Sequence, residues 1–258
     1  MALLNSKTAI VTGAASGIGA ISARTFADHE ASVVVASVDE AGGRETVASI
    51  EDDGGEATFV EMDVSTPVDA DRMIETAVTA YGGLDVLFNN AAVEGPVAST
   101  VNHEEAEFEH VLAVNLKSVW LGMKYGIEAM LDDGGGSIIS TSSIGSMVAI
   151  PEYAAYGAAK AGVNQLTRTV AIEYIDRNIR ANAIAPGVVQ TEMVDRVIEA
   201  DADRTAGIRE PMPPGLSDPT DIANAAVFLG SELSKQITGT TLPVDGGYLS
   251  EGKHDLSI

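Results

Sequence analysis

Two side chains four residues apart, Tyr156 and Lys160, could together transfer a proton. Apolar periodicity predicts a helix over 156–177, and residues at i and i+4 share one helix face. Free tyrosine, with a pKa of about 10, is a poor base at neutral pH. An ammonium about 4 Å away, at an effective dielectric of about 20, would favour phenolate by about 4 kcal/mol, or roughly three pKa units. The pair suits acid/base catalysis, although this spacing alone is more often an exposed helix pair.

Polar residues near predicted strand ends favour the catalytic interpretation. Ser143 follows a strand predicted at 137–141, and Asn90 and Ala91 follow one predicted at 86–89. Ligands of open parallel sheets bind at the carboxyl ends of strands, so these residues should face one cleft. Asn115 interrupts an apolar helical run, where a buried amide calls for a specific role.

A glycine-rich turn follows the first predicted strand and opens a helix. It contains Gly13, Ser16, Gly17, Ile18 and Gly19. Glycines allow a sharp turn and a close backbone approach, and the helix N-terminus attracts a pyrophosphate. A tight turn needs glycines for steric reasons alone, so its place after the first strand carries the argument. No Gly-Lys-Ser/Thr follows, which excludes a P-loop.

The second and third predicted strands bear on which dinucleotide binds. Ser37 ends the second strand, where an acid often accepts from a ribose 2′-hydroxyl. Val38 offers no cation for a 2′-phosphate, and Asp39 would repel one, so NAD(H) is favoured over NADP(H). Asp63 and Val64, after the third strand, could hold the adenine or form only a turn.

Alternating short β-branched runs and longer amphipathic stretches must position these residues. Strands are predicted at 8–12, 32–37, 57–61, 86–89, 137–141, 179–185 and 241–244. Helices are predicted at 18–29, 44–52, 68–81, 104–130, 156–177 and 221–229. This alternation indicates an α/β fold, a doubly wound parallel sheet of about seven strands with helices on both faces. We expect one domain over 1–258, with a proline-containing substrate lid at about 188–217.

Composition narrows the possible partners. Asp and Glu number 38 against 15 Lys and Arg, a formal net charge of -23, which disfavours nucleic acid. Acidic residues spread along the whole chain are typical of proteins from salt-loving organisms, although an acidic interaction surface is an alternative. There is no cysteine, and the four histidines lack metal spacing, so no metal is expected. With no apolar run of about 18–20 residues and no signal-like start, we expect no membrane partner and a cytoplasmic location.

The ordered motifs resemble the short-chain dehydrogenase/reductase family over nearly the whole chain. They are the glycine turn, Asn89-Asn90-Ala91, Asn115, Ser143, Tyr156-x-x-x-Lys160 and the segment 186–191. The resemblance implies a Rossmann-type fold and hydride transfer between NAD(P)(H) and a secondary alcohol or ketone. It makes Tyr156 the general acid/base, Ser143 the substrate-oxygen donor and Asn115 part of a water relay. Lys160 would grip the nicotinamide ribose and lower the tyrosine pKa.

The resemblance also assigns further contacts and leaves points open. Pro186, Gly187, Val189 and Thr191 match the segment that cradles the nicotinamide, and the family forms homotetramers or dimers. Two residues depart from the pattern: Ala92 stands where the family has glycine, and Ser37 replaces the usual acid. Substrate-pocket candidates are Glu94, Tyr153, Met193 and Met212, although the methionines could simply fill gaps. The alternatives are a 3-oxoacyl thioester reductase and a non-catalytic cofactor-binding regulator.

Overall fold

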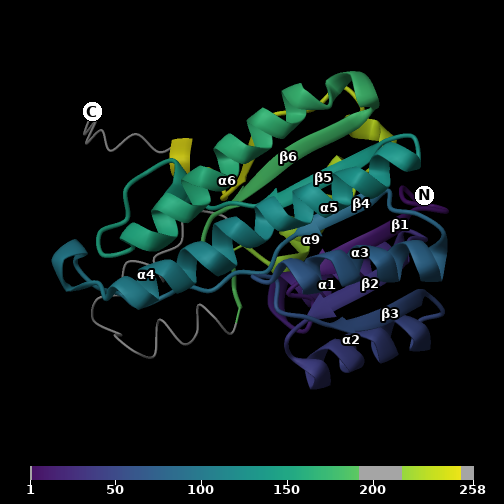
Figure 1. Cartoon of the computed structure of the whole chain (residues 1–258), viewed down its shortest axis with the longest axis horizontal. Coiled ribbons are helices and arrows are strands. Elements are labelled where there is room, and N and C mark those ends of the chain that lie inside the picture. The colour runs from purple at the N-terminus through teal and green to yellow at the C-terminus, as the bar shows by residue number, and fades with distance from the viewer. Residues whose placement is uncertain (1, 192–216, 251–258) are drawn as a thin grey trace, which may run out of the picture.

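The computed structural model describes residues 2–191 and 217–250, and its centre is a seven-stranded parallel sheet (Figure 1). The strand order is β3-β2-β1-β4-β5-β6-β7. The strands are β1 (Thr8–Thr12), β2 (Ser32–Ser37), β3 (Glu56–Glu61), β4 (Val86–Asn89), β5 (Gly136–Thr141), β6 (Ile179–Pro186) and β7 (Thr241–Val244). The predicted doubly wound sheet is confirmed, and every predicted strand matches an observed one to within one residue at each end.

Helices cover both faces of the sheet and enclose two apolar cores. They are α1 (Gly17–Asp28), α2 (Glu40–Asp52), α3 (Pro67–Tyr81), α4 (Glu105–Leu112), α5 (Ser118–Asp132), α6 (Ala154–Glu173) and α9 (Pro219–Gly230). One core joins the sheet to α3, α5 and α6, and the other joins it to α1, α2 and α9. Covering on both faces explains the continuously apolar strands, of which β1 is buried at every residue.

Local signals set the starts of α2 and α3 at the carboxyl edge of the sheet and the end of α3 at the opposite edge. Asp39 begins α2 by accepting from the Gly42 amide, and Thr66 begins α3 by accepting from the Asp69 amide. Pro67 occupies the first turn of α3, and Gly82 ends that helix in the left-handed conformation at φ 90°. The predicted start of α2 was four residues late because its first turn, at 40–43, carries two glycines.

The single helix predicted over 104–130 is wrong in one respect. The chain forms α4, then a π-helical segment at Ala113–Lys117, then α5. The break surrounds Asn115, whose side chain bonds to the backbone of Val93. An inserted π turn adds a residue to the helix and redirects a side chain, and such turns frequently occur at functional sites.

Only part of the expected lid lies within the described residues. Val188–Thr191 and Ser217 are described, and Val189 pairs with Ser217 in an isolated parallel bridge. Met193 and Met212 lie outside the described residues. No helix within the two described ranges is both long and apolar enough to cross a membrane.

Candidate active site

Three of the predicted catalytic residues meet where β5 ends and α6 begins. The Ser143 side chain lies close enough to the Tyr156 hydroxyl to lower the pKa of that phenol. Lys160 is 1% exposed, and its Nζ donates to the Thr141 carbonyl at 2.7 Å. The same Nζ lies 5.7 Å from the centre of the Tyr156 ring. Helical spacing therefore brings tyrosine and lysine together, and the carboxyl end of β5 supplies the partners of both.

The ionisation of the pair differs from the sequence expectation. Burial raises the pKa of Tyr156, the bond from Ser143 lowers it, and the charge of Glu94 raises it further. Burial also lowers the pKa of Lys160 from 10.5 to about 8. The net direction in the chain by itself is upward, and the lowering of the tyrosine pKa by Lys160 stays a prediction. The Lys160 ammonium is engaged by the Thr141 carbonyl, and burial is the largest influence on the pKa of the phenol.

Asn115 acts on the backbone beside the cleft. It is fully buried, its Oδ1 accepts from the Val93 amide at 2.8 Å, and its Nδ2 donates to the Val93 carbonyl at 2.7 Å. This two-point clamp holds the segment that leaves β4 and carries Glu94. The part of Asn115 in a water relay stays a prediction, and the clamp is its contribution in the structure.

The glycine turn has the shape that a pyrophosphate requires. Gly13 and Gly17 have positive φ values of 65° and 51°, which side chains rarely adopt. A Cβ at Gly13 would lie 2.8 Å from the Ala91 Cα, and one at Gly19 would lie 2.1 Å from the Gly13 carbonyl oxygen. Ser16 precedes α1 without a side-chain cap bond, so the first amides of that helix remain available to an anion. These features fit a dinucleotide cofactor.

Asn90 fixes the strand ends around that turn. Its amide nitrogens bond to Thr12, the backbone N–H to the hydroxyl at 2.9 Å and Nδ2 to the carbonyl at 3.1 Å. The Thr141 hydroxyl donates to Asn90 Oδ1 at 3.1 Å. Asn90 thereby links β1, β4 and β5 and connects the glycine turn to the carbonyl that holds Lys160.

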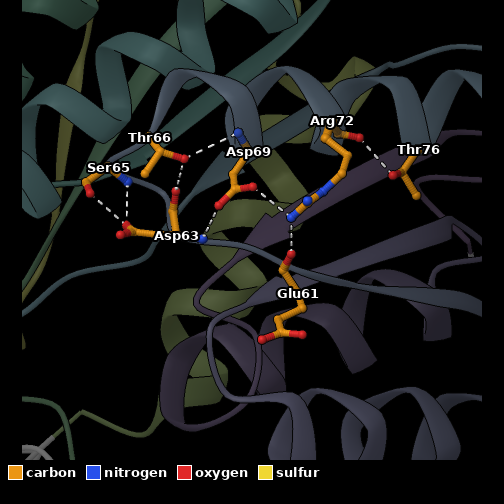
Figure 2. Close-up of polar contacts among 7 residues, drawn as sticks. All are labelled: Glu61, Asp63, Ser65, Thr66, Asp69, Arg72 and Thr76. Atoms are coloured by element: carbon orange, nitrogen blue, oxygen red, sulfur yellow. Dashed lines mark hydrogen bonds and ion pairs between the residues drawn. The ribbon is translucent and has the colours of Figure 1, made fainter.

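The strand ends expected to face the adenosine are rigid (Figure 2). Asp63 Oδ1 accepts from the backbone and hydroxyl of Ser65 at 2.8 and 2.7 Å, and the Asp63 amide donates to Asp69 Oδ2 at 2.9 Å. Arg72 pairs with Asp69 Oδ1 at 2.8 Å and also donates to the Glu61 carbonyl. Both interpretations of Asp63 are thus compatible, since the turn exists and fixes a carboxylate. Contact of Asp63 and Val64 with adenine stays a prediction.

On the second strand, Ser37 interacts with its own neighbours. The Asp39 amide donates to the Ser37 hydroxyl at 3.2 Å, while Asp39 caps α2. Val38 is 67% exposed at this edge.

The segment after β6 closes the opposite end of the cleft. Pro186 ends the strand, and the Gly187 amide donates to the Val244 carbonyl at 3.0 Å. A Cβ at Gly187 would lie 2.9 Å from the Asp245 Cα, so only glycine fits there. Thr191 reaches the glycine turn, because a Cβ at Gly17 would lie 3.6 Å from the Thr191 Cγ2. The predicted nicotinamide segment thus faces the predicted pyrophosphate turn.

A cavity of about 360 Å³ opens beside Tyr156. Its lining includes Tyr153 and the aliphatic side chains of Met147, Val148 and Ile150. The Tyr153 hydroxyl donates to Glu94 Oε1 at 3.1 Å, and the Tyr153 ring lies edge-on to Tyr156 with centroids 6.4 Å apart. Two predicted pocket residues, Glu94 and Tyr153, are therefore joined. Sequence reasoning missed the aliphatic stretch 147–150, although its position directly after Ser143 could have indicated it.

Within the described ranges, no group of three or more His, Cys, Asp or Glu side chains could hold a metal ion. The arrangement instead combines a phenol, a hydroxyl and a buried amine beside a cavity with both aliphatic and polar lining, and a glycine turn that could accept a phosphate. Such a set of groups can transfer a proton to or from a substrate oxygen beside a dinucleotide.

Comparison with known proteins places this arrangement in a family. A family model described as enoyl-(acyl carrier protein) reductase matches residues 13–249. The 3beta-hydroxysteroid dehydrogenase 1 of Eggerthella lenta is 42% identical over 248 residues, covering 95% of this chain and 94% of that protein. The cyclohexanol dehydrogenase of Acinetobacter sp. (strain SE19) is 35% identical over 247 residues, covering 96% of each.

A solved structure agrees with these relatives. The structure of 7 alpha-hydroxysteroid dehydrogenase complexed with NADH and 7-oxo glycochenodeoxycholic acid has a TM-score of 0.89 and 32% identity, covering 95% of each chain. The family expected from the motifs is confirmed: the chain belongs to the short-chain dehydrogenase/reductase family of NAD(P)-dependent oxidoreductases.

Proposed function

We propose that the chain interconverts a secondary alcohol on an apolar ring and the corresponding ketone, with Tyr156 as the proton donor and acceptor. The observation that carries this proposal is the position of Tyr156 at the edge of the 360 Å³ cavity, with Ser143 close enough to lower its pKa and Lys160 buried one turn further along α6. A substrate oxygen between the two hydroxyls would meet a donor and a proton acceptor at once.

Each side chain has a distinct task in this mechanism. Tyr156 removes the hydroxyl proton during oxidation and returns it to the carbonyl oxygen during reduction. Ser143 Oγ accepts from the Gly145 amide at 3.0 Å, which leaves its own proton for donation to Tyr156 or to the substrate oxygen. A bound nicotinamide supplies or accepts the hydride, and its oxidised form adds a positive charge to the site.

Lys160 has two roles in the proposal. Among the described residues its one hydrogen-bond partner is the Thr141 carbonyl, so two further N–H groups remain for the hydroxyls of a ribose. With a pKa of about 8, the amine still carries its charge at neutral pH and favours the phenolate. Because burial raises the pKa of Tyr156, this charge and that of the oxidised cofactor are both needed to form the base.

The lining of the cavity supports an alicyclic substrate. Its aliphatic side chains suit a hydrocarbon ring, while the Glu94 carboxylate held by Tyr153 disfavours an anionic group at that side. The two relatives and the solved structure named above carry names of steroid and cyclohexanol dehydrogenases. A secondary alcohol on an alicyclic ring is therefore the substrate class that we propose.

NAD(H) is the proposed cofactor in preference to NADP(H). Asp39 lies at the start of α2 beside Ser37, and a 2′-phosphate there would meet its negative charge. The ratio of kcat/KM for NAD⁺ to that for NADP⁺ should exceed one. A ratio below one would contradict this choice.

We also propose that the chain self-associates, as a homotetramer or dimer. A groove of about 670 Å³ between α4, α5 and α6 is almost wholly apolar, and Trp120 in its lining is 46% exposed. A second copy related by twofold symmetry would present the same face, so one Trp120→Ser substitution alters both sides. Light scattering at molar KCl should show smaller particles for this variant than for the wild type.

The 3-oxoacyl thioester reductase remains a second candidate, because the matching family model is described as a reductase of carrier-bound acyl chains. The chain has 38 Asp and Glu against 15 Lys and Arg, so its surface would repel an acidic carrier protein. One panel separates the candidates: cyclohexanol-type alcohols and ketones, linear alcohols and a 3-oxoacyl thioester, each followed through NAD(P)H absorbance in molar KCl. We expect turnover with the ring substrates. Turnover with the thioester alone would favour the second candidate, and none at all would favour a non-catalytic regulator.

A further inference from the structure

A buried amide lies on α6 one turn beyond Lys160. Asn164 is 4% exposed and continues the face of the helix that carries Tyr156 and Lys160 at spacings of four. We propose that Asn164 is a positioning residue that holds Ser143 against Tyr156 through the hydroxyl of Ser146, an inference that rests on the function proposed above.

The connection runs through two hydrogen bonds. Asn164 Nδ2 donates to Ser146 Oγ at 2.8 Å, and Ser146 Oγ donates to the Ser143 carbonyl at 2.5 Å. The Ser142 hydroxyl lies 3.0 Å from the same Ser146 oxygen. Because Asn164 donates to Ser146 Oγ, and the Ser142 hydroxyl can do so as well, the single Ser146 hydroxyl proton is directed to the Ser143 carbonyl. That carbonyl also accepts from the Ser146 backbone amide at 3.0 Å.

This arrangement fixes a short turn. Ser143 precedes a 3₁₀ turn at Ile144–Ser146, and its Oγ accepts from the Gly145 amide inside that turn. The Ser146 tether holds the carbonyl of Ser143, so the backbone and the hydroxyl of Ser143 are restrained together. Without Asn164, Ser146 Oγ would lose a donor that orients it, and the Ser143 carbonyl would be held by the Ser146 backbone amide alone, so the direction of the Ser143 hydroxyl would be less tightly restrained.

The amide has a feature that packing alone does not explain. Asn164 Oδ1 is buried and has no hydrogen-bond partner among the described residues. An unpaired buried oxygen costs stability, and an apolar residue of similar shape would avoid that cost. Retaining Asn here is consistent with a need for its donor, the Nδ2 that reaches Ser146.

The same helix offers a matched control. Thr167 is fully buried three residues later, and its Oγ1 has no partner within the described part of the chain. Thr167→Val therefore removes a buried polar atom of α6 without touching the tether. Asn164→Leu removes the tether with little change of volume, and Ser146→Ala removes its other half.

The first measurement is steady-state oxidation of a ring alcohol by the wild type and the variants. Asn164→Leu and Ser146→Ala should each lower kcat between about 10-fold and about 100-fold, as displacement of a reacting group does. The KM for the cofactor should stay unchanged, because neither residue reaches the glycine turn. The double variant should lose no more than the worse single variant, since both break one connection. Wild-type kcat in Asn164→Leu, or additive losses, would overturn the proposal.

The pH profile separates positioning from a general loss of structure. The Ser143 bond lowers the pKa of Tyr156, while Glu94 raises it. The other titratable groups near the phenol, Tyr153 and Lys160, keep their places in these variants. Weakening the Ser143 bond should therefore move the acid limb of the kcat profile to higher pH in Asn164→Leu. Thr167→Val should leave that limb in place, and an unmoved limb in Asn164→Leu would contradict positioning.

Hydrogen exchange tests the tether without any turnover. The amides of Gly145 and Ser146 should exchange faster in Asn164→Leu than in the wild type, and at the wild-type rate in Thr167→Val. Unchanged exchange in Asn164→Leu would overturn the tether even in an active enzyme. A wild type that oxidises no alcohol would instead contradict the proposed function, and the exchange difference would still decide whether the tether exists.

Discussion

Replacing Lys160 by methionine should abolish turnover and yet stabilise the fold near neutral pH. Burial lowers the pKa of this lysine from 10.5 to about 8, so the folded chain carries its charge at a cost. At about 1.4 kcal/mol per pKa unit, that cost is about 3 kcal/mol at pH 7. Methionine fills a similar volume but loses the bond to the Thr141 carbonyl, a net of about 1 kcal/mol.

The expected gain at pH 7 is thus about 2 kcal/mol, or a rise in Tm of about 4–8 °C for a chain of this size. The gain should fall as pH rises. Between pH 8 and 10.5 the unfolded wild type binds one proton more than the folded wild type, so the stability of the wild type rises relative to the variant. Above pH 10.5 the wild type should be the more stable by about 1 kcal/mol, the worth of the hydrogen bond alone.

Denaturant unfolding of both proteins at several pH values, in molar KCl, measures this difference. Lys124 provides the control, because it is an exposed lysine of α5 that contacts the rings of Trp120 and Tyr125. Lys124→Met should shift stability by an amount that does not change between pH 7 and 10. The reasoning would be refuted if Lys160→Met were less stable than the wild type at pH 7, or if the difference in unfolding free energy between the two proteins did not change with pH.

Three further predictions concern the cofactor turn, the cavity and the surface. Gly13→Ala and Gly54→Ala should each lose about 1–3 kcal/mol of stability through positive φ, and Gly13→Ala should lose more because its Cβ would lie 2.8 Å from the Ala91 Cα. Only Gly13→Ala should weaken NADH binding in a fluorescence titration, because nothing lies within 4 Å of a Cβ at Gly54. Equal NADH affinity in both would count against the turn as a phosphate site. Glu94→Gln should move the acid limb of the kcat-versus-pH profile for alcohol oxidation to lower pH, because the Glu94 carboxylate raises the pKa of Tyr156. An acid limb at the wild-type pH would show that Glu94 does not affect this pKa. The Tm should rise from dilute buffer to molar KCl, where the Debye length is about 3 Å and repulsion within a chain of net charge -23 is screened; a flat or falling Tm would contradict salt adaptation.

The sheet could be predicted from sequence because each strand is a compact apolar run bounded by turn residues. Val33, Val34 and Val35, for example, are all fully buried between two helix layers. Such runs need no knowledge of distant contacts to be recognised. That Ser143, Tyr156 and Lys160 lie together could be predicted for a similar reason. The carboxyl ends of parallel strands lie at one edge of the sheet, and a spacing of four residues places two side chains on one face of a helix.

The features that escaped prediction depend on contacts between distant segments. The π-helical break surrounds Asn115 because Val93, 22 residues away in sequence, binds both ends of its amide. The direction of the Lys160 amine is set by the Thr141 carbonyl, and spacing along α6 could not show that partner. The pKa of Tyr156 follows from burial, which a charge-distance argument between two side chains leaves out.

Turnover by Tyr156→Phe is the most direct test of the central claim that this phenol transfers the proton. The substitution removes one oxygen and leaves the glycine turn, the segment 186–191 and the Lys160 amine in place. We expect kcat of Tyr156→Phe with a ring alcohol to be between about 100-fold and about 10,000-fold below that of the wild type, and its Kd for NADH to equal the wild-type value. Wild-type turnover in Tyr156→Phe would contradict the account.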